Sequence, residues 1–259
     1  MASKWEIVVN YERWEYEMKS IVITGGGSGV GFAIAQDLAL NNKVILVGRD
    51  ENKLQIAQTF LGDNVSYIAG DLSTVTGREK VVNFIFKQTN HIDVLIHSAG
   101  IYPKNNQDNI NINLLSHYYL TIALKKLLDN SRVIIITGNP QAIKMVPICE
   151  LQINDMTRAA WAVTHKTLLM YLLADELAIS QTTVNSFFPG DVKSDLMPYT
   201  QSLTNTVVPA GKLLALDGKF DHLTANFFDE RANVVNLSNE KYNKNIAVNT
   251  LSKYIPELN

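Results

Sequence analysis

Short, almost continuously apolar runs alternate along this chain with longer segments whose apolar residues recur at helical spacing. Strands are expected at 21–23, 43–47, 65–69, 94–97, 133–136 and 183–187, and helices at 32–40, 54–61, 78–88, 111–128 and 156–179. Wholly apolar strands separated by helices are typical of a parallel sheet that is covered on both faces. The pattern predicts a single-domain α/β fold with a doubly wound, Rossmann-like parallel sheet.

The regular alternation begins near residue 18. The preceding segment, 1–17, is rich in Trp, Tyr and Glu, and we expect an N-terminal extension without an assigned function. Residues 18–259 then form the dinucleotide-binding domain. Its tail from about 191 is irregular and rich in Pro and Gly, so we expect this tail to carry a substrate loop over the site.

Composition narrows the function classes. The chain has 259 residues and a net charge of -2, which gives no electrostatic attraction to nucleic acid or anionic lipid. A single cysteine, Cys149, excludes an internal disulfide and a cysteine-based metal cluster, and we predict no metal site. Without an apolar run of spanning length or a signal-peptide pattern, we expect a cytoplasmic protein that acts on a small molecule or on none. A homo-oligomer is compatible with the sequence.

The segment Thr24-Gly-Gly-Gly-Ser-Gly-Val-Gly31 lies between the first expected strand and the first expected helix. Small residues there allow the backbone to approach a pyrophosphate, whose charge then lies at the helix N-terminus. A flexible turn is the alternative interpretation. The strand–loop–helix context favours dinucleotide binding.

On these residues the chain resembles the short-chain dehydrogenase/reductase family. The family pattern Thr-Gly-x-x-x-Gly-x-Gly is matched by Thr24, Gly25, Gly29 and Gly31, and the resemblance extends to about residue 196. It implies a nicotinamide cofactor and hydride transfer between that cofactor and a carbonyl or an alcohol.

The end of the second strand bears on the choice of cofactor. NAD-preferring members of the family have Asp at the position of Gly48, and the next residue here is Arg49. A guanidinium pairs well with phosphate oxygens, so we expect NADP(H), while Asp50 keeps NAD as an alternative. The resemblance implies the following cofactor-binding residues: Gly25, Ser28, Gly29, Val30, Gly31, Arg49, Asp71, Leu72, Ser98, Ala99, Gly100, Pro189, Gly190 and Val192.

The family's catalytic set of Asn, Ser, Tyr and Lys is only partly matched. Asn113 corresponds to the Asn, but Gly138 stands at the Ser position and leaves Thr137 as the nearest hydroxyl. The Tyr and Lys positions fall on Trp161 and His165 by local similarity. Counting back from Pro189 places them instead on Ala159 and Val163, and the sequence does not choose between the two registers.

An imidazole can donate and accept protons near neutral pH, so His165 is a candidate substitute acid. A buried structural histidine is the alternative for His165. The neighbouring Lys166 is interpreted as a surface lysine, and a cationic contact to the cofactor ribose is the alternative for it. The candidate catalytic residues are therefore Asn113, His165 and Thr137. Two functions follow: an oxidoreductase with an altered acid, or a non-catalytic nucleotide-binding sensor or scaffold. We expect slow or absent turnover of ordinary carbonyl compounds.

Overall fold

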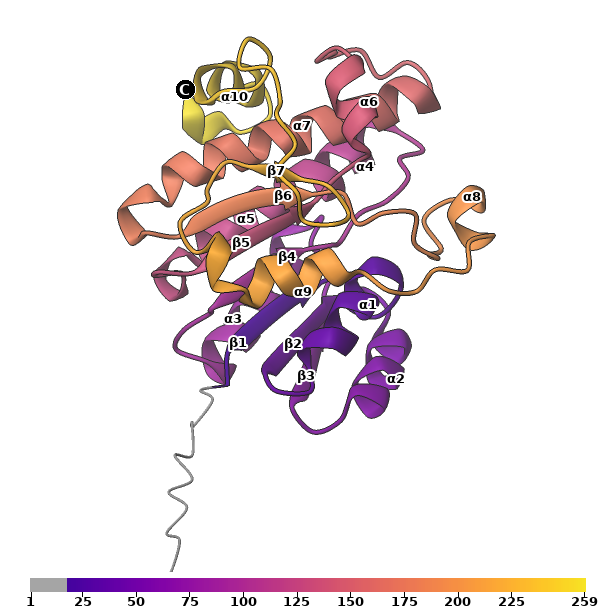
Figure 1. The fold of residues 1–259 in the computed structure, drawn as a ribbon, viewed down its shortest axis with the longest axis vertical. Coiled ribbons are helices and arrows are strands. Elements are labelled where there is room, and N and C mark those ends of the chain that lie inside the picture. The colour runs from indigo at the N-terminus through magenta and orange to yellow at the C-terminus, as the bar shows by residue number, and fades with distance from the viewer. Residues whose placement is uncertain (1–17) are drawn as a thin grey trace, which may run out of the picture.

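A computed structural model describes residues 18–259, which form a seven-stranded parallel sheet in the order β3-β2-β1-β4-β5-β6-β7 (Figure 1). The strands are β1 Ser20–Thr24, β2 Lys43–Gly48, β3 Val65–Ala69, β4 Val94–His97, β5 Arg132–Ile136, β6 Thr183–Phe187 and β7 Phe227–Phe228. The predicted doubly wound α/β fold is confirmed. The extension predicted for 1–17 lies outside the described residues.

The order of the strands reverses beside β1. The chain proceeds from β1 outward to β2 and β3, and then returns to the other side of β1 for β4 to β7. Thr24, the last residue of β1, pairs in register with Val47 of β2 and with His97 of β4. Ligands of such sheets bind where the strand order reverses, outside the carboxyl ends of the strands.

Both faces of the sheet are buried, as the apolar strands predicted. In β1, Ile21 and Ile23 contribute to one core cluster, and Val22 contributes to the cluster on the opposite face. Helices α1 Gly29–Leu38, α2 Glu51–Leu61 and α9 Pro209–Leu216 pack on the first face, and α3 Val75–Gln88, α5 Ser116–Ala123 and α7 Asp155–Glu176 pack on the second. Helix α10 Lys244–Leu251 lies on the outer side of α7 (Figure 1). Among residues 18–259, no helix is both long and apolar enough to cross a membrane.

The long helix predicted for 111–128 is present, but it begins earlier, at Asn106, and is not α-helical throughout. Helix α4 Asn106–Ile110 is followed by a π-helical turn at Asn111–Leu115, then by α5, and the segment ends in a 3-10 turn at Lys125–Leu127. π-Helical turns inside α-helices are frequent at functional sites. Here the wider turn contains Asn113, one of the candidate catalytic residues.

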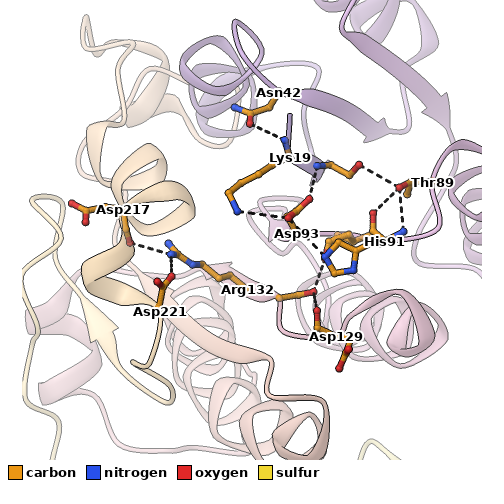
Figure 2. A network of polar contacts seen from close by, with 12 residues as sticks. Lys19, Asn42, Thr89, His91, Asp93, Asp129, Arg132, Asp217 and Asp221 are labelled. Atoms are coloured by element: carbon orange, nitrogen blue, oxygen red, sulfur yellow. Dashed lines mark hydrogen bonds and ion pairs between the residues drawn. The ribbon is translucent and has the colours of Figure 1, made fainter. Parts of the chain in front are cut away.

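A polar network joins the tail to the amino ends of the strands, opposite the reversal edge (Figure 2). Asp93 accepts a hydrogen bond from the backbone N–H of Ser20 at 2.7 Å and forms an ion pair with Lys19. Arg132 forms an ion pair with Asp221 and donates to the backbone carbonyl oxygens of Leu214 and Asp217. The network thereby anchors the C-terminal end of α9 to β5.

Candidate cofactor and active site

A cavity of about 810 Å³ opens at the carboxyl ends of the strands, where the strand order reverses. The predicted cofactor residues that line it are Gly25, Ser28, Gly29, Val30, Arg49, Asp71, Leu72, Ser98, Ala99, Gly100, Pro189, Gly190 and Val192. Asn113 and Thr137 line it as well. Two predicted residues, Gly31 and His165, do not.

The glycine loop forms one wall of this cavity. Gly25 and Gly29 have positive φ angles of 69° and 55°, which glycine adopts without the strain caused by a Cβ atom. The Ser28 side chain makes no capping hydrogen bond to α1. The first N–H groups of that helix therefore remain available to an anion, as a pyrophosphate site requires.

Gly31 acts in packing and not in the cavity wall, which corrects its predicted contact with the cofactor. A Cβ atom at Gly31 would lie 2.4 Å from the carbonyl oxygen of Gly25. No side chain fits at that distance, so the absence of a side chain at Gly31 lets α1 begin directly against the loop.

The ends of β2 and β3 form the second wall. The Arg49 side chain is exposed at the edge of the cavity. Asp50 caps α2 by accepting a hydrogen bond from the backbone N–H of Lys53 at 3.0 Å. The ammonium of Lys53 pairs at 2.8 Å with Asp195, and this contact holds the pKa of the Asp195 carboxyl below its ordinary value. Lys53 and Asp195 both line the cavity, so the pair joins the tail loop to the edge that also carries Arg49.

Asp71 follows β3 and lines the cavity beside Leu72. Its Oδ1 atom accepts hydrogen bonds from the backbone N–H and the hydroxyl of Ser73, at 3.0 and 2.7 Å. These bonds fix the carboxylate in a turn at the cavity wall.

The first part of the tail forms a third wall of the cavity. Gly190 has a φ of 84°, and the chain then passes the glycine loop so closely that a Cβ atom on Gly29 would lie 2.9 Å from the Cβ atom of Ser194. Residues 191–200 contribute several side chains to the cavity lining. A ligand that lies along the glycine loop would therefore be covered by this segment.

Asn113 holds the loop after β4 in place. Its Oδ1 atom accepts from the N–H of Ile101 at 3.1 Å, and its Nδ2 atom donates to the carbonyl oxygen of Ile101 at 3.0 Å and to Asn109 at 2.8 Å. Both amide hydrogens are thus engaged. This arrangement favours a positioning role for Asn113 over direct participation in proton transfer.

Three residues meet where β5 ends against α7. The hydroxyl of Thr137 donates to the carbonyl oxygen of Val163 at 3.3 Å. The Val163 side chain lines the cavity and lies over Gly138, with its Cγ1 atom 2.5 Å from the position of a Cβ atom on that glycine. Val163 therefore lies on the face of α7 that borders the cavity.

Trp161 and His165 lie on another face of α7. Their rings stack with centroids 4.1 Å apart, and the indole N–H donates to the hydroxyl of Tyr254 at 3.1 Å. His165 is fully buried, its Nδ1 atom contacts the carbonyl oxygen of Trp161 at 2.9 Å, and burial lowers its pKa to about 4. A buried, neutral imidazole away from the cavity cannot act as the substitute acid, so that prediction is not retained. The geometry favours the Ala159/Val163 register.

Lys166 was wrongly interpreted as a surface residue. Its side chain is 9% exposed and reaches the cavity beside Gly100, where a Cβ atom would lie 3.9 Å from Nζ. Burial lowers the pKa of its ammonium to about 8. Lys166 lies three residues after Val163 and shares its helix face, so the register that the structure favours also brings Lys166 to the cavity. Other lining residues that sequence reasoning missed are Lys53, Tyr102 and Ser116.

Comparisons with known proteins agree with this geometry. Residues 19–204 match the sequence profile of the family described as short chain dehydrogenase. A 3-oxoacyl-[acyl-carrier-protein] reductase of Rickettsia prowazekii is 32% identical over 197 residues, which cover 69% of this chain and 74% of that protein. The chain belongs to the short-chain dehydrogenase family. Human retinol dehydrogenase 11 is 28% identical over 202 residues, which cover 70% of this chain and 64% of that protein.

Solved structures of short-chain dehydrogenases share the fold. One from Salmonella enterica serovar Typhi superimposes with a TM-score of 0.70 at 22% identity, covering 83% of this chain and 96% of that one. A 3-ketoacyl-(acyl-carrier-protein) reductase from Brucella melitensis, described as complexed with NADH, gives a TM-score of 0.64 at 18% identity, covering 82% and 96%. Membership of this family of oxidoreductases leaves open how the present site donates a proton, since Gly138, Ala159 and Val163 carry none.

Proposed function

We propose that this chain is an NADP(H)-dependent oxidoreductase that transfers hydride between the cofactor and a carbonyl or alcohol substrate. One observation carries the proposal: a single cavity extends from the glycine loop and the N-terminus of α1, past Arg49, to Lys166 and Gly138 beside β5. Gly25 and Gly29 would hold the pyrophosphate of the cofactor. The nicotinamide would supply or accept a hydride at the end of the cavity near Lys166.

The charges at the β2 edge support NADP(H) over NAD(H). The exposed guanidinium of Arg49 and the ammonium of Lys53 lie at one side of the cavity. The carboxylate of Asp50 caps α2 and is engaged there. A 2′-phosphate would therefore meet the guanidinium of Arg49 at this edge, whereas the ammonium of Lys53 is already paired with Asp195. Guanidinium–phosphate pairs are strong and can be bidentate.

The substrate class rests on the family. The relatives named above are a reductase of 3-oxoacyl groups and a retinol dehydrogenase, so a carbonyl carbon or its alcohol is the common reacting group. The cytoplasmic location, a small-molecule substrate and self-association remain predictions from the sequence.

A non-catalytic nucleotide-binding role is the second candidate. It is favoured by Gly138 and Ala159, because neither can provide the hydroxyl that the family uses at the corresponding positions. Such a protein would bind the cofactor in the same cavity without hydride transfer.

Fluorescence titration with NADPH and NADH tests cofactor binding directly. The wild type is expected to bind NADPH at least about tenfold more tightly than NADH, a difference of about 1.4 kcal/mol. Arg49→Ala should abolish most of this preference, whereas the control Arg231→Ala, at an exposed arginine away from the cavity, should preserve it. If neither dinucleotide binds, the proposed function is wrong.

Catalysis is tested by following the oxidation of NADPH in the presence of 3-oxoacyl thioesters, aldehydes and ketones. Alcohols are assayed in the reverse direction with the oxidised cofactor. Turnover supports the oxidoreductase. Tight binding without any turnover supports the sensor or scaffold in its place.

A further inference from the structure

Lys166 is a buried cation that no described residue neutralises. Its side chain is 9% exposed, and within residues 18–259 its ammonium has no hydrogen-bond acceptor or carboxylate partner, so that burial is the sole influence on its pKa. Burying an unpaired charge is unfavourable unless another group compensates for it. Because Nζ borders the cavity, the compensating group is expected to be a ligand.

Groups from β4, α5 and the π-helical turn lie close to Lys166 and leave it as the positive charge among them. His97 of β4 and His117 of α5 lie near it, and burial lowers the pKa of His97 to about 3 and that of His117 well below its ordinary value. Both imidazoles are therefore neutral at pH 7. Asn113, from the π-helical turn, lies beside Gly100 as Lys166 does, and Tyr102, from the loop after β4, lines the same cavity.

We propose that Lys166 is the proton donor to the substrate oxygen in the reduction. This inference rests on the proposed function. Hydride from the reduced nicotinamide forms the new C–H bond at the carbonyl carbon, and the π electrons of the C=O bond move to oxygen. That oxygen takes a proton from Nζ of Lys166 and becomes a hydroxyl. The neutral amine that remains regains a proton from water entering through the mouth of the cavity.

The location of Lys166 fits this role better than that of any residue from the family's own pattern. It lies one helical turn beyond Val163, whose side chain covers Gly138, and its Nζ atom borders the cavity beside Gly100, which follows β4. Ala159 and Val163 have no proton to donate. With its pKa lowered to about 8, the ammonium is mostly protonated at pH 7, and a pKa close to the working pH suits a general acid.

The kinetic test compares Lys166→Met and Lys166→Arg with Lys126→Met, a control at an exposed lysine outside the cavity. In the wild type, kcat/KM for carbonyl reduction should fall about tenfold per pH unit at pH values above about 8, because the neutral amine of Lys166 cannot donate a proton to the substrate. Lys166→Met should lower kcat/KM at least about 100-fold and remove this alkaline decline. Lys166→Arg should bind NADPH within a few-fold of wild type and still fail to turn over, while Lys126→Met behaves as wild type.

Competitive acetylation of the wild type without substrate gives a second measurement that does not depend on turnover. Mass spectrometry measures the acetylation of the peptide that contains Lys166 relative to the peptide that contains Lys126. The reactivity of Lys166 should rise with pH, with a midpoint at about pH 8. Bound NADPH should protect Lys166 from acetylation.

The outcomes separate the two proposals. If wild-type protein binds no NADPH, or binds it without transferring hydride to any carbonyl, the proposed function fails and the proton donor with it. If the wild type turns over and Lys166→Met keeps both the rate and the alkaline decline, only the role of Lys166 is overturned. If Tyr102→Phe removes the alkaline decline in kcat/KM and Lys166→Met does not, the role of Lys166 as proton donor is likewise overturned.

Discussion

The side chain of Val163 occupies the space that a side chain at position 138 would need. Its Cγ1 atom lies 2.5 Å from the position of a Cβ atom on Gly138, which is shorter than any van der Waals contact. Valine is stiff at χ1, so it cannot easily turn away. The absence of a serine at 138 and the presence of valine at 163 are therefore one coupled feature of the site.

Restoring the family serine alone should consequently harm the protein. Gly138→Ser is expected to lower the free energy of unfolding by about 1–3 kcal/mol through overpacking. Adding Val163→Ala should recover part of this loss, because the smaller side chain vacates the space. A double-mutant cycle measured by urea unfolding gives the coupling. Strictly additive effects would show that the two side chains do not compete.

Gly31 should affect folding and cofactor binding together. Gly31→Ala places a Cβ atom 2.4 Å from the carbonyl oxygen of Gly25, so α1 and the glycine loop must separate. We expect a loss of about 1–3 kcal/mol in unfolding free energy and weaker NADPH binding. Gly218→Ala is the control, because the nearest atom to its Cβ position is 3.5 Å away. Unchanged stability and binding in Gly31→Ala would contradict the packing role.

His97 should make the fold sensitive to acid. Its folded-state pKa of about 3 lies below the ordinary value, so as pH falls below about 6.5 the unfolded chain takes up a proton that the folded chain refuses. The contribution of His97 to the free energy of unfolding is fully present above about pH 6.5 and is lost as the pH falls towards about 3. Within this range the free energy of unfolding should fall by about 1.4 kcal/mol per pH unit for one proton.

The replacement His97→Asn should flatten that decline. The shorter Asn side chain does not reach the hydroxyl of Thr121, which lies 2.7 Å from the His97 Nε2 atom, so a constant loss of stability is expected at every pH and the slope is the informative quantity. Urea unfolding between about pH 5 and 7 measures the slope. The exposed His222→Asn is the control, since water solvates this side chain in both states. An identical slope in His97→Asn and wild type would count against the burial argument.

Arg132 should contribute to stability through the network of Figure 2. Arg132→Met removes the donors to the carbonyl oxygens of Leu214 and Asp217, at 2.8 and 3.1 Å, and the ion pair with Asp221. Unsatisfied, partly buried carbonyl groups should lower the unfolding free energy by about 1–3 kcal/mol. The exposed ion pair between Lys219 and Asp217 provides the control. Lys219→Met should change the free energy of unfolding by less than about 0.5 kcal/mol. Equal effects of the two substitutions would show that the carbonyl contacts are unimportant.

The sequence by itself determined the parallel sheet and most of the cofactor wall. Wholly apolar strands separated by helices leave few other ways of burying their side chains. The register of Thr24 with Val47 and His97 is an observation of the structure. The glycine loop and the residues that end the strands reach the cavity because parallel strands present their carboxyl ends at one edge. Local pattern is sufficient for such residues.

Only the tertiary structure decided which side chains of α7 face the cavity. Trp161, His165 and Lys166 follow one another closely in sequence, yet two pack towards Tyr254 and the third reaches the cavity. A helix buried on several sides gives no clear apolar stripe from which its rotation can be inferred. The rotation of α7 about its axis is set by its contacts with α10 on one side and with Gly138 on the other. These contacts join residues that are far apart in the chain. They also determine which proton-donating side chains reach the cavity.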